Sequence, residues 1–187
     1  MYIRNAAGMD AAQIQAIYAP YVKETAITFE YDVPTVAEMA GRMADTMQKY
    51  PCLVAEERGE ILGYAYAGPF KARAAYDWAV ETTIYVKQEC HGRGVGRALY
   101  LALEERLKQM HILNACACIA YAEKEDEFLT NASMRFHEKM GYHLVGRFHQ
   151  CGYKFGRWYD MIWMEKMLGE HIDEPLPVTL LEYNFRK

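Results

Sequence analysis

The stretch VETTIYVKQECHGRGVGRALYLALEERLKQM, residues 80–110, is the most informative part of this chain. A β-branched run ends in a loop with glycine at positions 92, 94 and 96, and the loop leads directly into an amphipathic helix. Glycines let a backbone approach a ligand closely, and the first amide groups of a helix have no partners within it. Together with the positive end of the helix dipole, these amides form a seat for a diphosphate. The stretch therefore predicts a cofactor site.

The composition narrows the class of protein. With 187 residues, the chain has the length of one domain that buries about 70% of its unfolded surface. The 21 basic and 25 acidic residues give a net charge of −4, which provides no overall attraction to nucleic acid or to a membrane surface. The N-terminus lacks the apolar segment of a secretory signal, and no run reaches transmembrane length. We expect no nucleic-acid partner and no membrane association.

The cysteines indicate a reducing compartment. The chain has 5 cysteines, an odd number without the spacing of a disulfide framework, which is typical of reduced thiols in a cytoplasm. Cys116 and Cys118 share one face of a predicted strand, and Cys151 lies near His149, but none of these forms a C-x-x-C or H-x-x-x-H pair. We therefore expect a cytoplasmic protein without a metal site.

Hydrophobic patterning predicts the element order β-α-α-β-β-β-α-β-α-β-β. This order favours the α/β class in its α+β form, with a central mixed β-sheet flanked by helices on both faces. A T-x-x-E capping box at Thr35 and Glu38 starts the second helix, and Gly141 is expected to end the last one. The strands are expected at residues 2–4, 52–57, 60–68, 79–87, 114–121, 142–150 and 158–167, and the later helices at 35–50, 95–110 and 132–140. The wholly apolar run 114–121 is expected to be buried.

Two common phosphate loops do not fit the glycine loop. A P-loop requires G-x-x-x-x-G-K-S/T, and neither GKS nor GKT occurs in the chain. A dinucleotide fingerprint requires G-x-G-x-x-G, but Arg97 and Leu99 stand where the third glycine would be. The loop also comes at mid-chain instead of near the start of a βαβ unit. The cofactor is therefore of another type.

The loop resembles the pyrophosphate loop of the GNAT N-acetyltransferase superfamily, Q/R-x-x-G-x-G/A, which lies between a central strand and a long helix. His91 to Gly96 match five of its six positions. His91 replaces the usual Gln or Arg, so we expect weaker anchoring at that edge. Longer strings are similar to the phosphinothricin and methionine sulfoximine acetyltransferases, and the similarity runs from about residue 2 to 165: Thr28-Phe29-Glu30, residues 50–86, FHEKMGY at 136–142 and GYKFGRWYD at 152–160.

The resemblance implies the acyl-CoA N-acyltransferase fold and acetyl-CoA as cosubstrate. It implies that the backbone of a central strand pairs with the pantetheine arm and that the glycine loop and the start of a later helix hold the rest of the molecule. The residues implied in cofactor binding are Thr83, Ile84, Tyr85, Val86, His91, Gly92, Arg93, Gly94, Val95, Gly96, Arg97, Asn131 and Ser133. Asn131 and Ser133 are also candidates to cap that helix.

Glu81 is the candidate general base. Strand alternation puts Glu81, Thr83 and Tyr85 on one face, among aromatic residues and with no cation nearby in the sequence. Burial there would raise the pKa of the carboxyl from its usual value of about 4.3 toward a useful range. The resembled enzymes have their proposed base at this position. An acidic residue at an exposed strand end is the alternative interpretation.

His137 is the candidate acid for the leaving thiolate. It stands four residues before Gly141, where many members of the superfamily carry a tyrosine and the resembled subgroup a histidine. An imidazole can give or take a proton near neutral pH. The alternative is a solvated histidine on a helix, and only the resemblance favours the catalytic role.

The acceptor pocket is predicted from the string KARAAYDW before the catalytic strand. Lys71, Arg73 and Tyr76, with Phe29 and Tyr85 as apolar walls, are the candidate substrate residues, and the Arg73 guanidinium suits a carboxylate or phosphinate. The segment after residue 121 is longer than in the resembled enzymes. Its acidic residues are expected to disfavour an anionic acceptor, namely Glu123, Glu125, Asp126 and Glu127.

We expect residues 1–167 to form the acetyltransferase domain and residues 168–187 to form an extension that packs on the same domain or on a partner. Leu181, Tyr183 and Phe185 alternate as in a strand. The resemblance implies a homodimer that transfers the acetyl group to the amine of a small amino-acid-like molecule, of the phosphinothricin, methionine sulfoximine or methionine sulfone type. Two alternatives are an acetyltransferase for another amine or a protein N-terminus, and a non-catalytic acyl-CoA-binding module.

Overall fold

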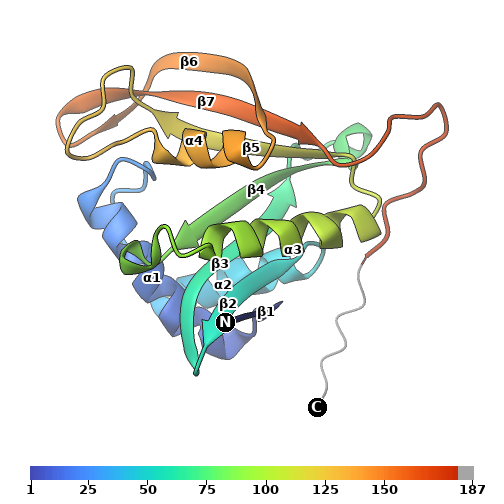
Figure 1. Ribbon diagram of the computed structural model, residues 1–187, viewed down its shortest axis with the longest axis horizontal. Coiled ribbons are helices and arrows are strands. Elements are labelled where there is room, and N and C mark those ends of the chain that lie inside the picture. Colours follow the sequence, from blue (N-terminus) through green and yellow to red (C-terminus); the bar gives the residue numbers. More distant parts are fainter. Residues whose placement is uncertain (181–187) are drawn as a thin grey trace.

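The computed structural model describes residues 1–180 and shows one seven-stranded mixed sheet with helices on both faces (Figure 1). The strand order is β1-β2-β3-β4-β5-β7-β6. Every neighbouring pair is antiparallel except β4 and β5, which run parallel. The predicted fold class and element order are confirmed.

The elements are bounded as follows. The strands are β1 Tyr2–Asn5, β2 Cys52–Glu57, β3 Glu60–Pro69, β4 Ala79–Val86, β5 Asn114–Tyr121, β6 His143–Lys154 and β7 Arg157–Met167. The helices are α1 Ala11–Glu24, α2 Val36–Met47, α3 Val95–Gln109 and α4 Ala132–Lys139. Short 3-10 turns lie at Gly8–Asp10, Ala74–Tyr76 and Gln88–Cys90.

The sheet separates two hydrophobic cores. Helix α3 covers one face of the sheet, where Leu99, Leu103 and Leu107 are fully buried against side chains of β2, β3 and β5. Helices α1 and α2 cover the other face, where Ile14 and Ile17 pack with residues of β2 and β3 (Figure 1). Alternation along the strands assigns side chains to one core or the other.

Local sequence signals account for several element boundaries. The Thr35 hydroxyl accepts a hydrogen bond from the Glu38 amide at 3.2 Å, and the Glu38 carboxylate accepts from the Thr35 amide at 2.7 Å, so the capping box is confirmed. Gly141 follows α4 with a φ of 88°, the left-handed conformation expected after a helix. The last two strands are longer than predicted, because a tight turn at Phe155 and Gly156, with φ values of 52° and 75°, joins them directly.

The sheet opens along one seam. Strands β4 and β5 pair only from Ala79 to Glu81 with Asn114 to Cys116, although each strand has eight residues. β5 then follows β7 along its whole length, while β4 stays with β3. Beyond Glu81 the edge of β4 that faced β5 has no strand partner among the described residues. β5 is buried or half-buried along its length, as expected, except at Cys118, which faces this opening and is exposed.

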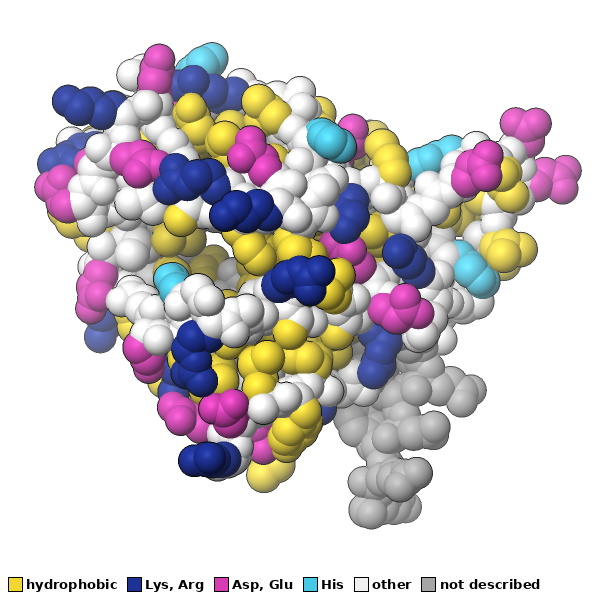
Figure 2. Space-filling model, in the orientation of Figure 1, with side chains coloured by type: hydrophobic (Ala, Val, Ile, Leu, Met, Phe, Trp, Pro, Cys, Tyr) yellow, Lys and Arg dark blue, Asp and Glu magenta, His cyan; other side chains and the backbone are white. Residues whose placement is uncertain are grey.

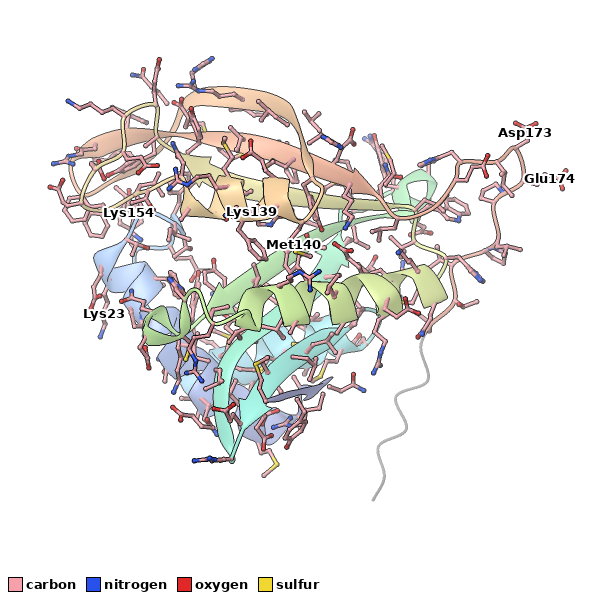
Figure 3. All side chains as sticks on the ribbon, viewed as in Figure 1. Lys23, Lys139, Met140, Lys154, Asp173 and Glu174 are labelled. Carbon is pink, nitrogen blue, oxygen red and sulfur yellow. The ribbon has the colours of Figure 1, made fainter. Side chains whose placement is uncertain are left out.

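The segment after β7 runs back along the domain. The Trp78 indole donates to the Leu176 carbonyl at 2.8 Å, and the Thr179 amide donates to the Met110 carbonyl at 3.1 Å. Asp173 and Glu174 project away from the body at the bend of this segment (Figure 3). The strand-like alternation at Leu181, Tyr183 and Phe185 lies outside the described residues. Within residues 1–180, no helix has the length and hydrophobicity needed to cross a membrane.

Candidate active site

A cavity of about 320 Å³ lies where β4 and β5 diverge. The space-filling view shows a hollow between the β5–β7 half of the molecule and the α3 half (Figure 2). The cavity is lined by the central part of β4, the outer half of β5, the segment before α2 and the buried side of α4. Among the predicted site residues that line it are Phe29, Glu81, Thr83, Ile84, Tyr85, Ser133 and His137.

Glu81 occupies the last paired position before the strands separate. Burial raises the pKa of the Glu81 carboxyl above its ordinary value, and the Lys71 ammonium partly offsets this. The sequence shows no cation close to Glu81 along the chain, but the fold brings Lys71 near it. Lys71 reaches the site from the loop before β4, where its ammonium lies 4.9 Å from the Phe70 ring centre and 5.5 Å from that of Trp163.

The glycine loop has the conformation that a diphosphate site requires. Gly92 and Gly94 have φ values of 76° and 81°, which residues with side chains rarely adopt. The space beside them is open, since a Cβ at either glycine would meet nothing within 4 Å. Gly94 is the N-cap of α3, so the loop leads into the free amides of a helix of 15 residues. This geometry fits the diphosphate of coenzyme A.

Gly96 has a different role, because it allows close packing between helix α3 and its neighbours. A Cβ at Gly96 would lie 3.3 Å from the Phe136 ring and 3.5 Å from the Ile84 side chain. This contact joins the first turn of α3 to α4 and to β4, and Val95 beside it is buried. The third glycine thus lets helix and sheet approach near the loop.

His91 anchors the loop to two neighbouring elements. Its Nε2 atom lies 2.8 Å from the Tyr21 hydroxyl on α1 and 3.2 Å from the Val86 carbonyl on β4. The Tyr21 hydroxyl also donates to the Val86 carbonyl. Arg93 contacts Glu57 at 3.3 Å, and Arg97 is exposed at the start of α3. His91, which stands where the resembled family usually has Gln or Arg, therefore has its own hydrogen-bond partners in this chain.

His137 lines the cavity as a buried, neutral imidazole. Its Nδ1 atom lies 2.8 Å from the Ser133 carbonyl, which only accepts, so Nδ1 carries the proton. Nε2 then accepts from the Tyr100 hydroxyl at 2.8 Å. Burial lowers the pKa of His137 to about 4. Both ring nitrogens are thus occupied, and no imidazole proton points into the cavity.

Asn131 does not cap α4 through its side chain, so that expectation is wrong. Its side-chain oxygen accepts from the Ala122 amide at 3.1 Å, and its side-chain nitrogen donates to the Ala122 carbonyl at 2.8 Å. These two bonds close the loop after β5. Ser133 does not cap the helix either; it lies inside α4 and lines the cavity.

The predicted acceptor residues divide into two groups. Phe29 and Tyr85 line the cavity, and Lys71 lies near Glu81. Arg73 and Tyr76 are exposed on the loop before β4 and do not line the cavity. Tyr76 instead packs edge-on against Phe70 at 5.9 Å, beside a separate surface hollow under the C-terminal segment.

The acidic residues of the loop after β5 all form ion pairs, so less of their negative charge is free than the sequence indicates. Each of its carboxylates pairs with an arginine from another element. The pairs are Glu123 with Arg147 at 3.0 Å, Glu125 with Arg135 at 2.6 Å, and Asp126 and Glu127 with Arg157 at 2.8 Å. Of this segment, Leu129 lines the cavity.

The sequence does not indicate that the β6–β7 hairpin contacts the residues on the acceptor side of the cavity. The Lys154 ammonium is buried and donates to the Thr28 carbonyl at 2.7 Å (Figure 3). The Phe29 ring packs on Gly152 so closely that a Cβ there would lie 2.2 Å from it. Both contacts involve the matched strings at 28–30 and 152–160. The only sequence signal was this shared match, because the two strings are far apart in the chain.

Within the described residues, no cluster of histidine, cysteine or acidic side chains could hold a metal ion. The groups that line the opening are the carboxylate, the histidine and tyrosines, and the open backbone edge of β4. These groups suit proton transfer next to a bound diphosphate-containing cosubstrate.

Comparison with known proteins identifies the group to which this site belongs. A model of the acetyltransferase (GNAT) domain matches residues 3–163. The chain belongs to the GNAT acetyltransferase family. It is an N-acetyltransferase by this membership, and the resemblance seen in the sequence is confirmed. The interpretation as a non-catalytic acyl-CoA-binding module is accordingly set aside.

Several relatives are similar over most of their length. The phosphinothricin N-acetyltransferase of Streptomyces viridochromogenes is 35% identical, with 85% of this chain and 83% of the relative aligned. The L-methionine sulfoximine/L-methionine sulfone acetyltransferase of Salmonella typhimurium is 34% identical over 91% of this chain and 96% of the relative. The crystal structure of a phosphinothricin acetyltransferase from Sinorhizobium meliloti in complex with acetyl-CoA has a TM-score of 0.83 and 33% identity, with 96% and 97% of the chains covered.

Proposed function

We propose that this protein transfers the acetyl group of acetyl-CoA to the amino group of a small amino-acid-like molecule. Phosphinothricin, methionine sulfoximine and methionine sulfone are the first acceptors to consider, since relatives aligned over most of the chain carry these names. The observation that carries the proposal is the position of Glu81: a half-buried carboxylate with a raised pKa at the point where the sheet opens.

Acetyl-CoA would be held by the backbone at two places. The loop from His91 to Arg97 offers its open glycines and the first amides of α3 to the diphosphate. The β4 edge from Thr83 to Val86 lacks a strand partner on the β5 side and would pair with the pantetheine arm, with the Val86 carbonyl already bonded to the Tyr21 hydroxyl. Ser133 lines the same cavity as this edge, and Asn131 stands at the N-cap position of α4.

Glu81 would act as the general base. The acceptor arrives as an ammonium ion, and the Glu81 carboxylate removes one proton, directly or through a water, so that the nitrogen lone pair can attack the thioester carbonyl. Acetyl-CoA supplies the activated acyl group and a thiolate leaving group. The raised pKa of Glu81 brings its basicity closer to that of the ammonium ion it must deprotonate.

His137 would assist as a positioning residue. With Nδ1 donating to Ser133 and Nε2 accepting from Tyr100, the neutral imidazole has no proton to give to the thiolate at pH 7. We infer that His137 fixes the Tyr100 hydroxyl at the wall of the cavity and that the thiolate takes its proton from solvent.

The loop before β4 would recognise the acceptor's carboxylate. Arg73 and Tyr76 are exposed on it, and Arg73 forms no ion pair within the described residues. A guanidinium can bind a carboxylate through two parallel hydrogen bonds. Lys71 on the same loop lies closest to the base, and Phe29 and Tyr85 would form the apolar walls.

We also propose a homodimer that uses the outer edge of the sheet, in the cytoplasm. β6 is an edge strand, and Leu144, Val145 and Phe148 on it are 60%, 59% and 56% exposed. An edge strand with large apolar side chains is a surface that a second copy can cover. All five cysteines are free thiols, in keeping with a reducing compartment.

The test is a panel of amino acids and amines mixed with acetyl-CoA and the purified protein, with release of free thiol as the readout. We expect turnover with at least one amino-acid-like acceptor. An acceptor panel that releases no thiol above the rate of acetyl-CoA hydrolysis would overturn the proposed function. Transfer only to polyamines or peptide N-termini would overturn the proposed acceptor class.

A further inference from the structure

A second cavity of about 360 Å³ lies beside the catalytic one, between α2 and strands β2, β3 and β4. Its apolar lining includes Met39 and Met43 on α2 and Cys52 on β2. Four residues line both cavities, so the two spaces adjoin at these side chains. These shared residues are Tyr18, Glu30, Tyr66 and Tyr85.

The second cavity is lined by a tyrosine whose hydroxyl has no hydrogen-bond partner among the described residues. Tyr64 is 3% exposed and lines only this cavity of the two. Its ring stacks on Tyr66 with centres 6.3 Å apart and on Tyr85 at 5.6 Å, so its orientation is fixed. Within residues 1–180 the Tyr64 hydroxyl forms no hydrogen bond. A tyrosine hydroxyl that lines a cavity and has no protein partner can both donate to and accept from a ligand or a water there.

The charges that line the second cavity disfavour an anion. Arg42 is the only cation that lines the second cavity among the described residues, and it pairs with Glu30 at 2.7 Å. The Asp45 carboxylate at the same cavity has no ion-pair partner in the described structure. Glu81 adds a further carboxylate in the neighbouring cavity. A negatively charged ligand group in the second cavity would meet an uncompensated carboxylate and no free cation.

Tyr64 and Glu81 are on the same face of the sheet. Tyr64 is opposite Tyr85 in the β3–β4 register, and Gly68 is opposite Glu81. Four residues along a strand and one strand across place their α-carbons about 14 Å apart. Both side chains extend from the face of the sheet that carries α1 and α2, so a molecule that contacts both must reach from one cavity into the other.

We propose that the second cavity receives the side chain of the acceptor and selects uncharged side chains that end in a hydrogen-bonding group over anionic ones. The inference rests on the proposed function and makes its acceptor specific: the amine is bound at Glu81, and the far end of the side chain bonds the Tyr64 hydroxyl. Among the acceptors named above, methionine sulfone and sulfoximine fit this description, and phosphinothricin, with its anionic phosphinate, does not.

The main test compares methionine sulfone with methionine, which has the same chain without the two oxygens. In Tyr64→Phe we expect the ratio of their kcat/KM values to fall about tenfold, because the ring remains and only the hydrogen-bonding group is lost. Tyr2→Phe, an exposed tyrosine on β1, is the matched control and leaves the ratio unchanged. Because the Tyr64 hydroxyl has no partner within residues 1–180, its removal breaks no hydrogen bond of the described fold.

A second variant tests whether the space itself is used. Met43→Trp fills the cavity, and we expect the preference for methionine sulfone over the short acceptor alanine to fall. Met47→Trp, one turn further along α2 and outside the lining, is the control. Asp45→Asn should reduce the preference for methionine sulfone over phosphinothricin.

The outcomes separate this inference from the proposed function. Wild-type protein that acetylates no amine overturns the proposed function. Wild-type protein that is active, with all three ratios unchanged in folded Tyr64→Phe, Met43→Trp and Asp45→Asn, overturns the inference and means that the cavity holds only water. A wild-type preference for phosphinothricin over methionine sulfone also overturns it.

Discussion

The two ends of β4 differ in what surrounds them. From Ala79 to Glu81 the strand is paired on both sides, with β3 and with β5. Beyond Glu81 it is paired with β3 only, and its other edge faces a cavity. The paired end fixes the strand, and the open end leaves backbone groups and side chains available to a ligand. Glu81 stands at the boundary: its backbone belongs to the paired end, and its side chain lines the cavity at the open end.

The side chains at the two ends of β4 also differ in how deeply they are buried. Val80 at the paired end is fully buried among aliphatic residues, as a strand in the middle of a sheet requires. At the open end, Thr83, Ile84 and Tyr85 are only partly covered. One strand thus contributes both to the core and to the site, because its neighbour β5 leaves after three residue pairs. Substitutions at the two ends should therefore have different consequences.

The largest expected effect is that of Glu81→Gln. The amide keeps the size of the side chain and cannot accept the proton, so kcat should fall by about 100-fold or more. Glu165→Gln is the matched control, because Glu165 on β7 is opposite Cys116, which is itself opposite Glu81. Steady-state kinetics at saturating acetyl-CoA measure both. Equal losses in the two variants would remove Glu81 from the mechanism.

Gly94→Ala should weaken binding of acetyl-CoA. The φ of 81° at Gly94 strains an alanine, so the loop relaxes and the helix amides move away from the diphosphate. We expect KM for acetyl-CoA to rise about tenfold. Gly59→Ala in the β2–β3 turn, at a φ of 83°, carries the same strain and should lower only the melting temperature. A Gly94 variant with wild-type KM would show that the loop does not hold the cosubstrate.

Gly152→Ala should act on the acceptor side. The new Cβ would lie 2.2 Å from the Phe29 ring, so the ring must move in the cavity that it lines. We expect a higher KM for the acceptor with little change in that for acetyl-CoA. Gly146→Ala on the same strand, where a Cβ meets nothing within 4 Å, should leave both unchanged. If both KM values rose equally in Gly152→Ala, Phe29 would not be specific to the acceptor.

The smallest effect concerns stability in acid. Burial lowers the pKa of His137 to about 4, whereas an unfolded histidine titrates near 6.5. The unfolded chain therefore binds a proton that the folded chain does not, and stability falls as the pH drops from about 6.5 to about 4, by up to about 3 kcal/mol. His137→Asn should have a shallower dependence. Denaturant unfolding between pH 7 and pH 4 measures this difference, and identical slopes would show that the imidazole is not buried neutral.

The sequence was sufficient for features that depend on neighbouring residues. Local patterns predict four features that the structure contains. They are the glycine loop, the capping box at Thr35, the strand alternation that turns Glu81 toward the cavity, and the order of elements. The resemblance added the cosubstrate and the family. These features needed no knowledge of which distant segments meet.

Features that depend on distant residues were not predicted. Three arginines from α4, β6 and β7 form ion pairs with the acidic loop, and nothing local to that loop indicates them. The Asn131 side chain bonds the backbone at Ala122 instead of capping α4. The opening of the sheet after Glu81 and the cavity at Tyr64 likewise result from how strands diverge and helices pack, which hydrophobic periodicity does not encode.

The most direct test of the central claim is the pH dependence of kcat/KM for the wild type and for Glu81→Gln. Because the carboxylate must be ionised to take a proton, we predict that the wild-type rate falls as the pH drops through an apparent pKa above the 4.5 of an ordinary glutamate. The residual rate of Glu81→Gln should lack this fall. A fall at the same pH in both proteins, or a wild-type midpoint at or below 4.5, would contradict the assignment of Glu81 as the base.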